Sequence, residues 1–200
     1  SGGVDVKVFD GLSPQDAGRL WVELLDIVHT VEDLPFPTVF AAHALCLTAA
    51  FELSLACDLL LAAESASFGL VERVVGLTPA MGGTQRVAER AGPARARELV
   101  MTGELFSAAA LERWNVVNRV LPGDGFDEAA RAFAMDLAEG PTLAHAATKR
   151  IVRAQLDGSA RTADELVPEV AGGLFATEDL RNAVRTFLEQ GPGKARFGGR

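Results

Sequence analysis

The sequence predicts an α/β core in residues 1–125 followed by a helical region in residues 126–200, and three observations support this. Short apolar runs, rich in β-branched and aromatic residues, alternate with stretches of helical periodicity in the first part. Beyond it, every remaining stretch has the periodicity and the start and stop signals of helices. A chain of 200 residues, 48% of them hydrophobic, is long enough to bury one sizeable core.

The first elements follow from local signals along the chain. Ser13 is placed as an N-cap, and the leucines behind it recur at helical spacing, which predicts a helix over Pro14–Glu32. Two prolines end this helix, and Thr38–Ala42 then has the β-branched and aromatic character of a buried strand. Ala49–Ala56 suits a buried helix, whereas Leu59–Ala63 resembles a parallel strand with both faces covered.

Glycine, proline and serine mark the boundaries of the later elements. Paired glycines open one helix, Gly92-Pro93 opens the next, and Ser107 caps a short third helix. The predicted elements are helices at 82–90, 93–102 and 107–114, a strand at 116–121, helices at 127–139, 141–156, 162–175 and 177–190, and an extended tail at 191–200.

Composition excludes several classes of function. The net charge of −8 argues against a general nucleic-acid binder, which needs a basic face to displace counterions. The longest apolar runs fall short of the roughly 18–20 residues that span a bilayer, and the first residues lack the pattern of a secretory signal. Two cysteines without a Cys-x-x-Cys pattern make a disulfide framework or a zinc site improbable. We therefore expect a cytoplasmic protein.

Two linked motifs carry the functional signal. The first runs Glu52-Leu53-Ser54-Leu55-Ala56-Cys57-Asp58, and the second comprises Phe68-Gly69-Leu70-Val71-Glu72 and Gly82-Gly83-Thr84-Gln85-Arg86. Together they resemble the signatures of the enoyl-CoA hydratase/isomerase (crotonase) family, and Lys194-Ala195-Arg196-Phe197 resembles its closing basic-aromatic segment. Because Ser1–Val6 resembles a segment that family members place after several strands, we expect the chain to be part of a longer protein.

The resemblance implies a crotonase-like (ClpP/crotonase) fold, with a core of repeated β-β-α units in a spiral and a C-terminal helical region that forms trimers. It implies hydration of a 2-enoyl-CoA thioester, with Glu52 and Glu72 as the acid/base pair. The backbone N–H groups of Gly2 and Ala49 would form the oxyanion hole. Residues that would contact the substrate are Val4, Thr48, Val75 and Ala80.

The same resemblance implies an acyl-CoA thioester as partner and a homotrimer or a dimer of trimers as the assembly. It implies no metal and no cofactor beyond the coenzyme A of the substrate. Isomerases, decarboxylases and hydrolases share this scaffold, so reaction type follows less directly than fold. Isomerases of the family commonly keep only the second glutamate, and the presence of Glu52 therefore favours hydration. A catalytically weak acyl-CoA-binding member is the alternative from another functional class.

These residue types suit the chemistry. Addition of water to an enoyl thioester builds negative charge on the thioester oxygen, which backbone N–H groups stabilise well. Two carboxylates on either side of one water can remove one proton and supply another, provided an apolar pocket tunes their pKa values. Ala49 and Glu52 are three residues apart, close to one helical turn, so both can face one pocket.

The chain also departs from the family pattern. Thr48-Ala49-Ala50 stands where a Gly-Gly-Gly turn is usual, His43-Ala44 where Asn-Gly is frequent, and Ala80 where glycine is common. If the turn needs a positive φ, a residue with a Cβ costs about 1 kcal/mol or more. Otherwise, the added methyl groups merely narrow the slot for the thioester.

Each candidate also has an ordinary structural interpretation. Glu52 alone suits a solvated helix face, but its apolar neighbours argue for burial, while Glu72-Arg73 alone suits an exposed loop pair. His43 is more typical of a wall residue than of a base, and Cys57 has no histidine partner nearby in sequence. Paired glycines at 82–83 favour a helix start over a phosphate loop, and Lys149-Arg150 favours a solvated face over contacts with coenzyme A phosphates.

Overall fold

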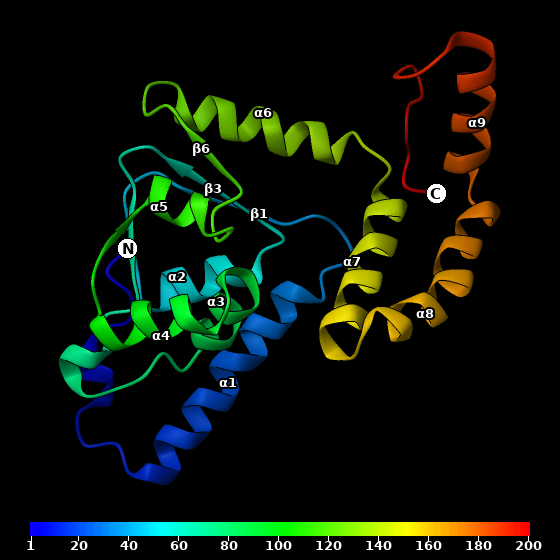
Figure 1. Ribbon diagram of the computed structural model, residues 1–200. Coiled ribbons are helices and arrows are strands. Elements are labelled where there is room, and N and C mark those ends of the chain that lie inside the picture. The colour runs from blue at the N-terminus through cyan, green and yellow to red at the C-terminus, as the bar shows by residue number, and fades with distance from the viewer. The chain divides into compact units, whose positions relative to one another are not determined.

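Two small sheets organise the first part of the chain. The computed structural model describes all 200 residues, which divide into two compact units, Ser1–Leu34 with Thr38–Arg131 and Pro35–Pro37 with Ala132–Arg200. The first unit contains both sheets together with the helices that pack on them (Figure 1). The division between the units falls inside helix α6, Phe126–Ala138.

The first sheet is entirely parallel and has the order β1-β3-β6. Its strands are β1 (Val39–Ala42), β3 (Leu59–Ala63) and β6 (Arg119–Leu121). Val39 pairs with Leu59, and Leu61 pairs with Arg119. Four of the five residues of β3 are buried, as expected for a central strand covered on both faces.

The second sheet consists of strands too short to be read from the sequence. It has the order β2-β4-β5, with strands β2 (Leu45–Leu47), β4 (Ser67–Gly69) and β5 (Phe106–Ser107). The β2–β4 pair is parallel and the β4–β5 pair is antiparallel. None of the three is longer than three residues, so no alternation pattern was available to predict them.

The predicted helices of this unit are confirmed. They are α1 (Pro14–Glu32), α2 (Ala49–Ala56), α3 (Gly83–Ala91), α4 (Pro93–Thr102) and α5 (Ala108–Arg113). Ser13 and Ser107 are N-caps whose side chains accept hydrogen bonds from Asp16 N–H and Ala110 N–H. Two short 3-10 helices, η1 (Val6–Phe9) and η2 (Glu72–Val75), were not predicted.

The strand predicted at 116–121 is shorter than expected. Only Arg119–Leu121 joins the sheet, because the N–H groups of Val116 and Val117 both donate to the carbonyl of Leu111 at the end of α5. Asn118 makes the transition, since its N–H donates to Leu60 at 2.8 Å while its side chain accepts from Leu60 N–H. The apolar run therefore closes a helix before it enters the sheet.

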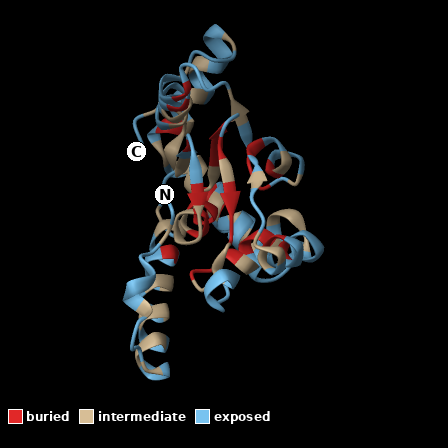
Figure 2. Cartoon of the chain, turned by 90° about the vertical axis from the view of Figure 1, so that its left-hand side faces the viewer, coloured by how far each residue is buried: buried red, intermediate tan, exposed pale blue.

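The core of the first unit lies where α2, α3 and α4 meet the two sheets. Figure 2 shows the buried residues gathered on the strands and on the helix faces turned toward them. Phe51 of α2 and Phe68 of β4 are both fully buried, with ring centroids 5.2 Å apart. Because α2 is apolar on nearly every face, its one glutamate is carried into the interior with it.

The second unit is helical. It contains the rest of α6 with α7 (Thr142–Asp157), α8 (Ala160–Gly173), the 3-10 helix η3 (Leu174–Ala176) and α9 (Glu178–Gln190). Thr177 caps α9, and the segment after it has no regular structure, as predicted. The N–H groups of Gly198 and Gly199 donate to the carboxylate of Asp179, which holds the last residues against the start of α9.

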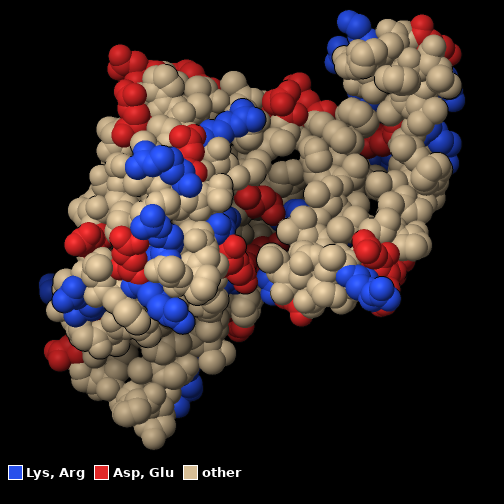
Figure 3. All heavy atoms as spheres, viewed as in Figure 1, with Lys and Arg blue, Asp and Glu red and all other residues tan.

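The distribution of surface charge and the length of the helices bear on nucleic-acid binding and on membrane crossing. Acidic and basic side chains are interspersed on the face shown in Figure 3, so no extended basic surface appears there. None of the helices combines the length and apolar character that a membrane crossing requires.

A strained residue joins β2 to α2. Thr48 has φ 48° and ψ −125°, a combination that glycine adopts readily and β-branched residues avoid. Its N–H donates to Gly69 at the end of β4, and its carbonyl accepts the first helical bond from Glu52 N–H at 2.8 Å. The turn thus does need a positive φ, and the need falls on Thr48, whereas Ala49 and Ala50 are already helical.

Replacing Thr48 by glycine is expected to stabilise the protein. Relief of about 1–3 kcal/mol of backbone strain exceeds the roughly 0.5–1 kcal/mol that glycine costs through the unfolded chain, for a net gain of about 1 kcal/mol. Denaturant unfolding of the intact protein measures the difference. Asn115→Gly is the matched control, because Asn115 also has a positive φ (63°) but asparagine tolerates it. A loss of stability in Thr48→Gly would contradict the strain.

Candidate active site

Glu52 is buried inside the first unit as an acceptor of backbone hydrogen bonds. Its side chain projects from the first turn of α2, and the residue is only 3% exposed. Its Oε1 atom accepts from Met81 N–H at 3.0 Å and from Gly83 N–H at 2.8 Å. The interpretation of Glu52 as a solvated face residue is therefore wrong, and its carboxylate is held at one oxygen by two main-chain donors.

The paired glycines make this approach possible. Gly82 has φ +91°, and Gly83 is the first residue of α3, so its N–H is one of those without a helical acceptor. A Cβ on Gly83 would lie 2.7 Å from Cγ of Glu52, closer than carbon atoms pack. The prediction that these glycines start a helix is confirmed, and that helix start receives a carboxylate of the chain itself.

Glu72 faces the same region from η2. It is half-buried, and its Oε2 atom is buried without a hydrogen-bond partner. Burial raises the pKa of Glu72 to about 7, and the charge of Glu52 raises it as well, against its own backbone N–H. Glu52 thus acts on Glu72 although the two come from separate elements, and Glu72 is not an ordinary exposed loop residue.

The pKa of Glu52 is raised by burial but has several opposing influences. The N–H groups of Gly83 and Met81, the guanidinium of Arg86 and the N–H of Ala80 all favour its ionised form. Glu72 has no comparable set of donors. The arrangement therefore suits one proton shared between two acids, with Glu72 the better holder of the proton and Glu52 the better base.

The N-terminal residues lie beside the start of α2. The N-terminal amine donates to Leu45 at 2.6 Å, and Leu47 N–H donates to Ser1 at 3.0 Å, so the first residue is attached to β2. Thr48 Oγ1 lies 3.5 Å from the carbonyl oxygen of Gly2. Gly2 and Ala49 are thereby brought to the same turn, and Ala49 N–H, the first of α2, has no helical carbonyl placed to accept it.

The four predicted substrate contacts lie around these groups to differing degrees. Thr48 precedes α2, and the backbone N–H of Ala80 favours the ionised form of Glu52 and so lowers its pKa. Val75 is three residues beyond Glu72 on η2 and is 49% exposed. Val4 follows Gly3 and is 36% exposed. The roles of all four in binding stay predictions.

The other residues considered from the sequence make contacts of their own. His43 is exposed and lines a hollow of about 390 Å³ with Ser65 and the start of α6. Cys57 is half-buried, and its thiol donates to the carbonyl of Leu53 at 3.8 Å. Burial raises the pKa of the other thiol, Cys46, to about 11, so that thiol stays protonated at neutral pH. In the second unit, Lys149 donates to the carbonyl of Phe36, and Arg150 pairs with Glu169.

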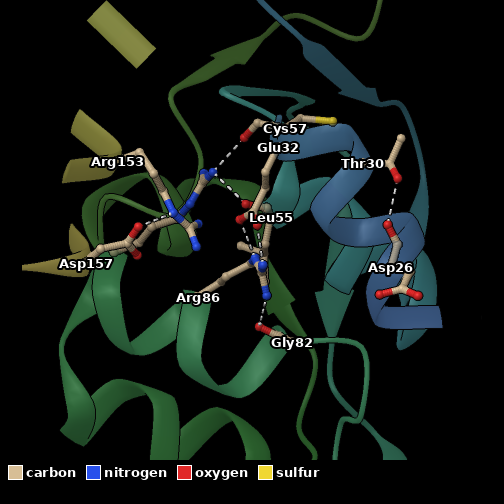
Figure 4. A network of polar contacts seen from close by, with 10 residues as sticks. Asp26, Thr30, Glu32, Leu55, Cys57, Gly82, Arg86, Arg153 and Asp157 are labelled. Carbon is tan, nitrogen blue, oxygen red and sulfur yellow. Dashed lines mark hydrogen bonds and ion pairs between the residues drawn. The ribbon is translucent and has the colours of Figure 1, made fainter. Parts of the chain in front are cut away.

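Sequence reasoning missed a second charged pair next to Glu52. Arg86 of α3 is 7% exposed and forms a two-point ion pair with Glu32, the last residue of α1, at 2.7 Å and 2.6 Å. Figure 4 shows Arg86 lying between Glu32 and Gly82. The partner lies 54 residues away in sequence, so no spacing rule could have identified it.

Comparison with known proteins places this site in context. The family profile described as "Enoyl-CoA hydratase/isomerase" matches residues 1–200. A protein of Mycobacterium bovis named "Probable enoyl-CoA hydratase" is 34% identical over 77% of this chain and 60% of its own length. A carnitinyl-CoA dehydratase of Salmonella heidelberg is 42% identical over 61% of this chain and 47% of its own length. The chain thus spans about half to three fifths of the length of these relatives.

Among solved structures, the enoyl-CoA hydratase of Bacillus anthracis superposes with a TM-score of 0.89 at 29% identity. The superposition covers 100% of this chain and 76% of that one. The chain therefore has the crotonase fold that its motifs predict. On the match over its whole length, the chain belongs to the enoyl-CoA hydratase/isomerase family.

Proposed function

We propose that the protein containing this chain is an enoyl-CoA hydratase that adds water to a 2-enoyl-CoA thioester. The observation that carries the proposal is the pair of carboxylates, Glu52 and Glu72: the charge of Glu52 raises the pKa of Glu72, and the two differ in their hydrogen-bond donors. Family membership supports a thioester substrate, and the hydratase and dehydratase names of similar proteins support addition or removal of water.

The proposed reaction uses the two acids in opposite roles. Ionised Glu52 accepts a proton from a water held between the carboxylates while the water oxygen bonds to Cβ of the substrate. The electron pair of the double bond moves toward the thioester, whose oxygen is stabilised by the N–H groups of Gly2 and Ala49. Protonated Glu72 then delivers its proton to Cα on the same face, which gives syn addition and a 3-hydroxyacyl thioester.

The alternatives to hydration are isomerisation and a catalytically weak acyl-CoA-binding protein. Isomerisation moves a proton between carbons and needs one carboxylate, so it is disfavoured by two acids that both lie in the site. A catalytically weak acyl-CoA-binding protein was suggested by the replaced glycine turn. Thr48 adopts the positive φ that the turn needs, and its Oγ1 lies 3.5 Å from the carbonyl oxygen of Gly2, so the altered sequence is compatible with the proposed donors.

The proposal extends to assembly. The helices of the second unit expose several large apolar side chains, namely Phe175 at 74%, Phe187 at 59% and Leu188 at 78%. Exposed apolar side chains on one region favour burial against another chain. Assembly as a homotrimer or a dimer of trimers stays a prediction. The same holds for a reaction without a metal or redox cofactor and for a cytoplasmic location.

Neutralising either acid should remove hydration. In the full-length protein, Glu52→Gln or Glu72→Gln is expected to lower kcat by roughly 100-fold to 10,000-fold, the usual contribution of a general acid or base. Loss of enoyl-thioester absorbance with crotonyl-CoA and longer chains measures the rate, and 3-hydroxyacyl-CoA substrates measure the reverse reaction.

The matched control is Glu23→Gln, the same substitution at an exposed position of α1, which should leave turnover unchanged. Slow turnover that is equal in all three variants and in the parent would contradict the two-acid mechanism and favour the binding interpretation. Isomerisation without hydration would reassign the reaction within the family.

The pH dependence should follow Glu72. Since hydration needs this carboxyl protonated and its pKa is about 7, kcat/KM is expected to fall as pH rises through about 7. The measurement is the pH profile of kcat/KM at constant ionic strength. A profile that stays flat to pH 9 would mean that Glu72 does not supply the proton.

Stability provides a check that is independent of turnover. Glu72 holds its proton more tightly in the folded state than its ordinary pKa of 4.5 allows in the unfolded state. The stabilisation of the folded state by this tighter proton binding is therefore fully present below about pH 4.5 and is lost as pH rises through about 7. The free energy of unfolding of the parent, relative to Glu72→Gln, should accordingly decrease over that interval.

A further inference from the structure

The turn that donates hydrogen bonds to Glu52 is itself held by a charged side chain. Arg86 Nη1 donates to the carbonyl of Gly82 at 3.2 Å, and Arg86 N–H donates to the same oxygen at 3.2 Å. The next residue, Gly83, points its own N–H at Oε1 of Glu52. A single peptide unit therefore has its carbonyl held by Arg86 and its N–H bonded to the proposed catalytic base.

The space around this peptide is closely filled by Arg86 and Glu52. Gly82 has φ +91°, and a Cβ there would lie 1.9 Å from Nη1 of Arg86. A Cβ on Gly83 would lie 2.9 Å from Oε1 of Glu52. Guanidinium, peptide and carboxylate thus lie in direct contact, so a displacement of Arg86 is passed on to the donors of Glu52.

Glu32 fixes Arg86 in this position. The ion pair uses Nε and Nη2, which leaves Nη1 for Gly82, and the side chains of Arg86 and Glu32 are 8% and 18% exposed. Two parallel bonds to a carboxylate set the plane of a guanidinium as well as its position. Lysine has no such plane and cannot make these contacts together.

We propose that Arg86, anchored by Glu32, is a positioning residue for the base of the hydration reaction, because it holds the Gly82–Gly83 peptide whose N–H binds Glu52. The inference rests on the proposed function for its catalytic meaning, but its structural content concerns the ionisation of one carboxylate. The charged side chain that acts on that carboxylate is Arg86 from α3, and Glu52 in turn acts on the carboxyl of Glu72 from η2.

The test uses one substitution at two arginines of the same helix. Arg86→Lys keeps the positive charge but loses the plane that joins Glu32 to Gly82. Arg90→Lys is the matched control, since Arg90 lies one turn further on and donates to the carbonyls of Leu55, Cys57 and Val116 without touching the Gly82–Gly83 peptide. Both variants lose buried hydrogen bonds, and both keep their charge.

The readout is the pKa of Glu52, followed by carbon-13 NMR of the side-chain carboxyl and assigned with Glu52→Gln. Arg86→Lys is expected to raise this pKa by about 0.5–1 unit, because loosened amide bonds favour the ionised form less. The acidic limb of the kcat profile should move upward by the same amount, with little change in KM. Arg90→Lys should lower stability and leave both quantities unchanged.

Three outcomes would overturn the proposal. An unchanged pKa of Glu52 in Arg86→Lys would mean that Arg86 acts by charge alone. The other two are an equal pKa shift in Arg90→Lys and a fall of the Glu52 pKa in Arg86→Lys. If Arg86→Lys does not fold, Glu32→Gln, which removes the ion pair that anchors Arg86 but keeps the arginine and its charge, is judged by the same criteria. A shifted pKa in a protein without hydratase activity would support the positioning role and reject the proposed function.

Discussion

The site depends on the hydrogen bonds between the buried carboxylate of Glu52 and the amides of Met81 and Gly83. A carboxylate that is 3% exposed without donors would be neutral at the pH of the cell, because burial disfavours the charged form. The two amides, with Arg86 behind them, restore part of what water would have supplied. Three nearby features support these hydrogen bonds. The apolar helix α2 carries Glu52 inward, the paired glycines let the backbone approach its carboxylate, and the turn at Thr48 sets the start of the helix.

Environment, more than residue type, distinguishes the two acids. Glu52 receives several donors at one oxygen, whereas Glu72 has a buried oxygen with no partner, and its pKa is raised to about 7. Two identical side chains can thereby occupy different protonation states, as acid/base chemistry on adjacent carbons requires. The charge of Glu52 discourages ionisation of Glu72, and the donors around Glu52 favour its own ionised form, so Glu72 is the acid that keeps the proton.

Much of this was predictable because it is encoded locally. Pro14–Glu32 and Ala49–Ala56 are bounded as predicted, since caps, prolines and apolar periodicity lie within a few residues of each boundary. The features that were not predicted are either strands too short to show a period or contacts between residues far apart in the sequence. Three strands of two or three residues carry no period, and Val116 and Val117 have the composition of a strand but are taken by the carbonyl of Leu111. The two glutamates were identified through motifs, whereas the pair of Glu32 and Arg86 forms only when α1 and α3 meet.

Thr48 shows how a substitution that looks damaging in sequence can leave a site in place. The turn needs a positive φ at one residue only, and the bonds at both ends of Thr48, to Gly69 and from Glu52, hold it in that conformation despite its Cβ. The strain at Thr48 therefore lowers the stability of the fold but leaves the geometry of the turn in place. Its side chain, in turn, lies against the first residues: a Cβ on Gly3 would be 1.5 Å from Thr48 Oγ1, so only glycine fits there. The residue that strains the turn thus also fixes the path of the segment that contributes the second proposed oxyanion donor.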